Sequence, residues 1–411
     1  METVTDLRES RMLSDDALEK LMQPIIDRQE NINNYIVGTI ANRLKKIGQL
    51  KAEDINRLQL LVQSGADIRK INLMLAKQSG LQVKDIKKVI KTVAKDDYID
   101  AKPFYDYRHK SFIPLEKNKN LNKITNAIAN QTGGTYKNIS DTRAIGFVLG
   151  NGKKKKFKKL SNAYKEIIDE AIQAVELGNM TYEVAVKRAI KQLMDSGVKK
   201  IYWDSGYTKR VDAAVRQAVH DGIKALHLQM QKEIAKQINA DGWRLSAHRN
   251  SAPDHEPIQG HVFTLDEFEN LQNNKPFKDT WGNSFKALKR VIGQWNCRHW
   301  ARAIIIGKDT GYRQETLQKY IDENAKGYTL PNGKHLTMYE CTQYQRQMES
   351  KIRDAKEAQM MAIASGDLEE AKKWQAKVSQ YTKEYESFSK ACGLGVKKDK
   401  IAVTGYKPMK I

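Results

Sequence analysis

Apolar residues in the first 200 positions recur mostly at three- and four-residue spacing, which predicts amphipathic helices. Leu18, Met22 and Ile25 follow this spacing behind Ser14, a candidate helix cap, and residues 52–62 and 68–78 repeat it. We therefore expect an N-terminal helical bundle. The glycines expected to separate or end its short helices are Gly48, Gly65, Gly80 and the pair Gly133-Gly134.

In the middle of the chain, the spacing of apolar residues changes once from a helical pattern to an alternating one. Residues 103–114 predict an extended connector, and helices are expected over 164–177, 181–194 and, longest of the three, Val211–Ile238. After Gly242 the pattern alternates in two stretches typical of short strands, Trp243–His248 and Gly260–Phe263. A compact α+β module is expected there.

The C-terminal hundred residues predict a β-hairpin around Asn332-Gly333, followed by two long helices over 339–364 and 368–392. Gly366 suits the end of the first helix, and Asp367 with Glu370 resembles a capping box for the second. The pair predicts an antiparallel helical hairpin. Its mixed Lys and Glu residues favour a solvated surface, with a docking arm as the alternative.

These patterns predict a mainly α fold with a small α+β module. We expect a helical N-terminal region over 1–100, a basic helical segment over 101–200, a compact Trp-, His- and Cys-rich module over 201–310, and the β-hairpin with its long helical hairpin over 311–411.

Charge narrows the range of partners. The net charge is +22, and residues 101–160 hold fourteen Lys or Arg against three acids, which favours a polyanionic partner. The best candidates for non-specific contact with double-stranded DNA form one lysine run, for which a solvated loop is the alternative. The run comprises Lys153, Lys154, Lys155, Lys156, Lys158 and Lys159. The preceding glycines lack the spacing of a phosphate-binding loop, which argues against an ATPase.

Three cysteines cannot form a disulfide framework, so we expect synthesis in a reducing cytoplasm. The N-terminal residues lack the pattern of a signal peptide, and no apolar run approaches the ~20 residues of a membrane span. We therefore expect no association with a membrane.

Reactive residue types concentrate between Trp203 and Trp300, which include one of the three cysteines and five of the six tryptophans. His248, His255, Cys297 and His299 carry the donor atoms of a tetrahedral zinc site, although their spacing is unorthodox. The alternative is a hydrogen-bonded network that holds a small irregular module together. The tryptophans favour a core over a surface that stacks bases.

The sequence supports enzyme interpretations of this segment less well than a zinc site or a hydrogen-bonded network. Pro257 breaks the helix that a His-Glu-x-x-His metalloprotease requires, and the deaminase motif is missing. His248, Asn296 and His299 offer the residue types of a metal-dependent nuclease. Cys297 and His299 would align as a thiolate pair only on an extended strand.

Ordered motifs along most of the chain carry a resemblance. They are Tyr202-Trp203-Asp204-Ser205-Gly206, Val211 to Arg216, Ser246-Ala247-His248, Gln259-Gly260-His261-Val262, Gly293 to His299, Thr337 to Arg346 and Ser389 to Leu394. From about residue 30 to about residue 400 the sequence resembles the minor capsid protein 2 family of tailed bacteriophages. The Mu F-like head morphogenesis proteins are a wider relative.

The resemblance implies a structural protein of the phage head, located near the portal and involved in head assembly or in the passage of DNA. It implies no active site. We expect residues 1–100 to include the portal contact. The motif positions that it marks are Trp203, Asp204, Gly206, Arg216, Ser246, His248, Gly260, Trp295, Asn296, Cys297, Arg298 and His299.

Overall fold

The structure is a computed structural model that describes residues 15–48, 57–144, 146–149, 156–159, 200–202, 208–294, 297–309 and 312–409, together with single positions between 166 and 188. Described residues up to Met22, Asp85–Gly134 and Gln217–Tyr344 form one compact unit, here called unit 1. Gln23–Lys84, Thr135–Arg216 and the residues from Gln345 onward form unit 2. Each unit therefore combines distant parts of the sequence, and the four consecutive segments expected from the sequence stay a prediction.

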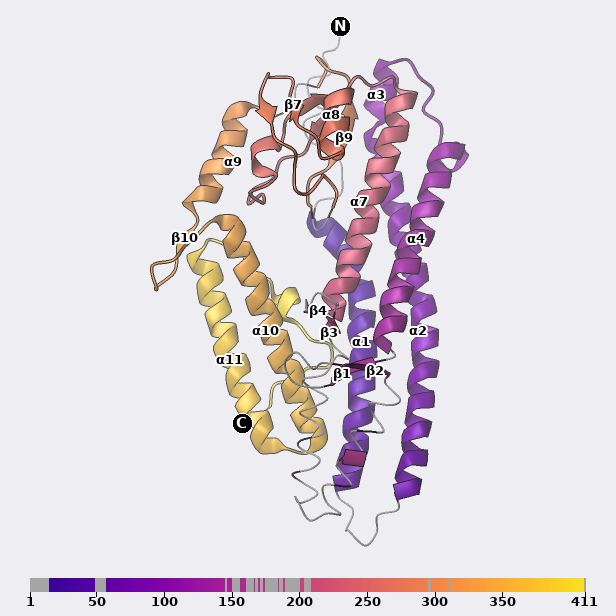
Figure 1. Cartoon of the computed structure of the whole chain (residues 1–411), viewed down its shortest axis with the longest axis vertical. Coiled ribbons are helices and arrows are strands. Elements are labelled where there is room, and N and C mark those ends of the chain that lie inside the picture. The colour runs from indigo at the N-terminus through magenta and orange to yellow at the C-terminus, as the bar shows by residue number, and fades with distance from the viewer. Residues whose placement is uncertain are drawn as a thin grey trace. The chain divides into compact units, whose positions relative to one another are not determined.

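Helices dominate the described residues, which confirms the predicted fold class (Figure 1). They are α1 (Asp15–Gly48), α2 (Arg57–Asp100), α3 (Lys102–Tyr107), α4 (Lys119–Ala144), α7 (Val211–Gln237), α8 (Leu265–Gln272), α9 (Gln314–Lys326), α10 (Met338–Ser365) and α11 (Leu368–Ala391). Short 3-10 turns occur at η2 (Leu115–Lys117), η4 (Glu256–Ile258) and η5 (Lys398–Ile401).

Several glycines lie inside helices, contrary to prediction. Helix α2 continues through Gly65 and Gly80, and α4 continues through Gly133-Gly134. A glycine inside a helix costs only about 1 kcal/mol relative to alanine. Buried side chains on both sides of the glycine pair, Thr132 and Tyr136, anchor α4 and offset that cost. Gly48 does end α1, as predicted.

The segment 103–114 is not extended throughout, because α3 covers its first half. Pro103 lies in the first turn of α3, where its missing N–H costs nothing. Phe104 and Tyr105 are buried, and Tyr105 donates a hydrogen bond to Gln237 at 2.6 Å. Burial therefore turns this aromatic segment into a helix.

Helix α7 confirms the long central helix predicted from the sequence. Its apolar row, including Val219, Ile223 and Met230, is buried. Gly222 allows a close approach to α4, since a Cβ atom at this position would lie 2.2 Å from Thr132 Oγ1. Small side chains at such points let two helices pack at short range.

A three-stranded antiparallel sheet with the order β6-β5-β9 forms the core of the predicted α+β module. Its strands are β5 (Gly242–Leu245), β6 (Val262–Thr264) and β9 (Ala301–Ile304). In the register, Trp243 lies opposite Phe263 on one side and Ala303 on the other. The two predicted strands are confirmed, although β5 ends before Ser246. The third strand, β9, was not predicted. Two-stranded ladders pair β7 (Phe277–Lys278) with β8 (Ser284–Phe285), and β3 (Lys200–Tyr202) with β4 (Thr208–Arg210).

The C-terminal prediction is confirmed. Strands β10 (Tyr328–Thr329) and β11 (His335–Leu336) form the hairpin, and α10 and α11 lie antiparallel (Figure 1). Three hydrogen bonds join the two helices, from Gln345 to Ser389, from Gln359 to Gln375 and from Tyr385 to Glu349. Asp367 accepts a bond from the Glu370 amide at 3.1 Å, and Gly366 has a φ of 82°.

Candidate functional site

Three of the four predicted metal-ligand residues meet in unit 1. His255, Cys297 and His299 are all almost fully buried, and one possible ligand atom from each lies within 4.8 Å of the others. His255 directly precedes η4, whereas Cys297 and His299 lie in the segment that leads into β9. The sheet brings these segments together because β5 pairs with both β6 and β9.

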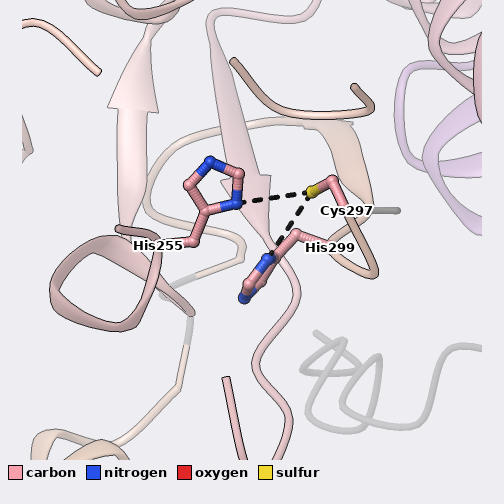
Figure 2. Close-up of side chains that lie close together, drawn as sticks. All are labelled: His255, Cys297 and His299. Carbon is pink, nitrogen blue, oxygen red and sulfur yellow. Dashed lines mark hydrogen bonds between the residues drawn. The ribbon is translucent and has the colours of Figure 1, made fainter. Parts of the chain in front are cut away.

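The sulfur atom is the centre of this cluster. Cys297 Sγ lies 3.4 Å from His255 Nδ1 and 3.7 Å from His299 Nδ1, so both imidazoles present the same ring atom to it (Figure 2). We call these three residues the His/Cys cluster.

Both imidazoles are held from their far sides. His255 Nε2 donates a 2.6 Å hydrogen bond to the Arg290 carbonyl, and His299 Nε2 lies 3.3 Å from Ser251 Oγ. The Arg290 side chain in turn makes a two-point ion pair with Asp254, at 3.0 and 2.8 Å. These contacts fix the orientation of the rings.

The surroundings of Cys297 make its thiol easier to ionise than an ordinary thiol. Burial alone raises the pKa of Cys297, but the hydrogen bond and charge of His255 outweigh it, and the pKa lies below the ordinary thiol value. For His255, burial lowers the pKa and the contact with Cys297 raises it by more. Burial, together with the charges of His248 and His255, holds the pKa of His299 well below its usual range.

His248, the fourth predicted ligand, is not in the convergent group. Its ring packs on that of His299 with centroids 4.4 Å apart, and its Nδ1 lies 3.0 Å from the Arg249 carbonyl. The His248 amide donates to Gln259 at 3.1 Å. His248 is therefore a packing neighbour of the cluster.

Other motif positions support the backbone around the cluster. Ser246 clamps Trp300 with two 2.8 Å bonds, one from its amide to the Trp300 carbonyl and one to its hydroxyl from the Trp300 amide. Gly260 has a φ of 75°, and a Cβ atom there would lie 2.5 Å from Leu317. Arg298 is exposed, and its carbonyl accepts a bond from Lys224. Arg216 lies in α7 and helps to lower the pKa of Asp212, although burial and two nearer arginines have larger effects.

The remaining predicted positions lie wholly or partly outside the described residues. Trp203, Asp204, Gly206, Trp295, Asn296, Lys153, Lys154 and Lys155 are outside them. Lys156, Lys158 and Lys159 belong to β2 (Lys156–Lys159), which pairs with β1 (Gly146–Leu149). The predicted helices over 164–177 and 181–194 also fall almost entirely outside the described residues.

A polar row on α7, which was not predicted from the sequence, positions the segment after Cys297. Lys224 donates to the carbonyls of Arg298 and His299, at 2.9 and 3.3 Å, and its ammonium lies 3.1 Å from the centre of the Trp300 ring. One turn later, His227 bonds the Ala301 carbonyl, and after a further turn Gln231 accepts a bond from the Ala303 amide. All three polar side chains are buried. Their three- and four-residue spacing within an apolar helix face was the available signal.

Replacing Lys224 with methionine is expected to lower the free energy of unfolding by about 1–3 kcal/mol, because two backbone carbonyls lose a buried charged donor. Lys236→Met is the matched control, since the Lys236 side chain on the same helix is 79% exposed. Urea unfolding followed by circular dichroism measures both variants. Equal losses in the two variants would show that Lys224 does not support this segment.

Comparison with known protein families gives a match over nearly the whole chain. A family model described as phage minor capsid protein 2 matches residues 13–389. The chain belongs to the phage minor capsid protein 2 family. As a member, it is a structural component of a phage capsid, and its expected location is the virion. No curated protein and no solved structure matches it.

The family and the geometry together bear on the enzyme interpretations. A minor capsid protein is a structural component, and the His/Cys cluster is buried, whereas a nuclease must expose its metal and base to a phosphodiester.

None of the described helices combines the length and apolar character that crossing a bilayer requires.

Proposed function

We propose that this capsid component belongs to the head of a tailed phage, where it associates with the portal and other head proteins and takes part in head morphogenesis and DNA packaging or ejection. The observation that carries the proposal is the family match over residues 13–389. The N-terminal helices, represented by α1 and α2, are the proposed portal contact.

Contact with DNA of any sequence is the second part of the proposal. It is supported by the net charge of +22 and by the basic stretch 101–160. Within unit 1, Lys110, Lys117, Lys119 and Lys123 of this stretch are exposed. Exposed ammonium groups in this number favour the phosphate backbone, which requires no base-specific geometry.

Head location is tested with purified virions and with the portal. Mass spectrometry is expected to find the chain in virions in few copies, and the tagged portal protein is expected to retain it after co-expression. The matched control is a chain that begins at Asp85 and therefore lacks α1 and the larger, N-terminal part of α2. Virions without the protein, or equal retention of both chains, would contradict the proposal.

Binding to random-sequence duplex DNA is expected to weaken steeply with salt. Replacing the six lysines between Lys153 and Lys159 with glutamine should reduce the slope of log K against log salt by about 0.9 for each phosphate that the variant no longer neutralises. Fluorescence anisotropy across a salt series measures this slope.

The matched control removes six exposed lysines from the α10–α11 hairpin and changes the net charge equally. They are Lys351, Lys372, Lys373, Lys377, Lys383 and Lys390. Equal slopes for the two variants would show that the lysine run is only a solvated loop. Metal-dependent cleavage of the DNA would instead favour a phage-carried nuclease or effector, the alternative function.

A further inference from the structure

The His/Cys cluster has the spacing of metal ligands. With Zn–S near 2.3 Å and Zn–N near 2.05 Å, a tetrahedral ion separates a sulfur from a nitrogen ligand by about 3.6 Å. Cys297 Sγ lies 3.4 and 3.7 Å from the two Nδ1 atoms. Both sulfur–nitrogen separations therefore match one ion, and the three ligand atoms lie within 4.8 Å of one another. Binding would bring the two Nδ1 atoms to about 3.3 Å from each other.

The outer contacts leave the correct atoms available. A carbonyl oxygen only accepts hydrogen bonds, so the Arg290 carbonyl keeps a proton on His255 Nε2, and the Nδ1 lone pair of the neutral ring points toward Cys297. Ser251 Oγ lies 3.3 Å from Nε2 of His299, and its hydroxyl is able to accept a hydrogen bond from that nitrogen. Metal-binding histidines are typically oriented by an oxygen partner on the other ring nitrogen.

A purely hydrogen-bonded cluster accounts less well for this arrangement. A neutral thiol can donate to only one of the two Nδ1 atoms that face Cys297 Sγ. A thiolate that accepts from both requires His255 to be a buried imidazolium, since the Arg290 carbonyl already keeps a proton on its Nε2. A cation satisfies both nitrogens and the sulfur together.

We propose that His255 and His299, through Nδ1, and Cys297, through Sγ, bind one zinc ion. A thiolate with two imidazoles is a donor set that favours zinc. Magnesium and calcium take oxygen ligands instead. The three residues fill three of the four tetrahedral positions. The ion would join the loop at η4 to the segment that leads into β9, two parts of the chain about 40 residues apart. This role is structural and independent of portal or DNA binding.

The test uses the full-length chain without a histidine tag, purified without chelators. Mass spectrometry of the metal content is expected to find about one zinc ion per chain. After exchange with Co²⁺, the absorption spectrum is expected to show a sulfur-to-cobalt charge-transfer band and the intense visible bands of a tetrahedral site. These bands should disappear in Cys297→Ser and persist in Cys341→Ser, whose original thiol is equally buried.

A variant outside the coordination sphere keeps the test decisive if Cys297→Ser fails to fold. Ser251→Ala leaves the three ligands in place and is expected to weaken zinc binding about 10-fold, measured by competition with a chromophoric chelator. A wild-type chain that holds no zinc after equilibration and shows no sulfur-to-cobalt band overturns the proposal. Full retention of the band in a folded Cys297→Ser variant overturns it as well.

Discussion

Replacing Asp212 with alanine is expected to lower the free energy of unfolding of unit 2 by about 3–5 kcal/mol, because it leaves two buried guanidinium groups without their shared carboxylate. Asp212 is 2% exposed and accepts hydrogen bonds from Arg210, at 3.0 Å, and from Arg353. Arg210 also makes a two-point contact with Glu357, at 2.9 and 3.1 Å. Denaturant unfolding followed by circular dichroism measures the loss.

Asp354→Ala is the matched control, since Asp354 contacts the same Arg210 but its side chain is 43% exposed. We expect it to cost less than about 1 kcal/mol, as surface ion pairs do. Similar losses in both variants would show that the buried network does not stabilise the unit.

The pH dependence of the same variant follows from the pKa of Asp212. Burial raises this pKa, but Arg210, Arg353 and Arg216 together outweigh burial and hold it well below the ordinary carboxyl value. A depressed folded-state pKa contributes stability that is fully present above the unfolded value of about 3.9 and is lost as the pH falls through the folded value. Acid unfolding of Asp212→Ala should therefore show a smaller dependence on pH below about 4 than the wild type does.

Replacing Trp243 with alanine is the second large effect, with an expected loss of about 3–5 kcal/mol from the core of the α+β module. Trp243 is 4% exposed and stacks on Phe268 with ring centroids 4.6 Å apart. Its strand β5 holds β9, which directly follows the His/Cys cluster. Chemical unfolding gives the loss, and faster labelling of the buried Cys297 thiol is expected to report a loosened cluster.

Trp281→Ala is the control within the same unit, because Trp281 is only half-buried and packs against His261 with ring centroids 4.5 Å apart. A loss as large as that in Trp243→Ala would contradict the assignment of Trp243 as the core residue of the sheet. For Trp243 the structure supports the core interpretation over base stacking, since a buried ring cannot reach a nucleotide.

Helices with an unbroken apolar row were predictable, as α7, α10 and α11 show. Strand β9 was not, because its second residue, Arg302, is buried and charged. Arg302 is accommodated by an ion pair with Asp100 at 3.1 Å, and a partner about 200 residues away leaves no local signal. The glycines inside α2 and α4 gave a local signal for helix ends that the structure does not follow. Tertiary packing outweighs the low helix propensity of glycine at these positions.

The candidate site was predictable in its members but not in its geometry. Residue chemistry selected His255, Cys297 and His299 from the rest of the chain, whereas their unorthodox spacing gave no means of separating them from His248. The path of the chain from β5 through η4 to β9 decides which imidazoles face the sulfur. Lys224, His227 and Gln231 were overlooked because polar residues within an apolar helix face acquire meaning only through the segment that they bind.

The buried network of unit 2 also sets the time at which the nascent protein can fold. Arg210 and Asp212 leave the ribosome about 140 residues before Arg353 and Glu357. At synthesis rates of roughly 5–20 residues per second, the two residues wait roughly 7–30 s for their partners. Unit 2 therefore cannot mature before α10 has been synthesised, and a chain that terminates before α10 is left, among the described residues, with Arg210 and Asp212 paired only to each other.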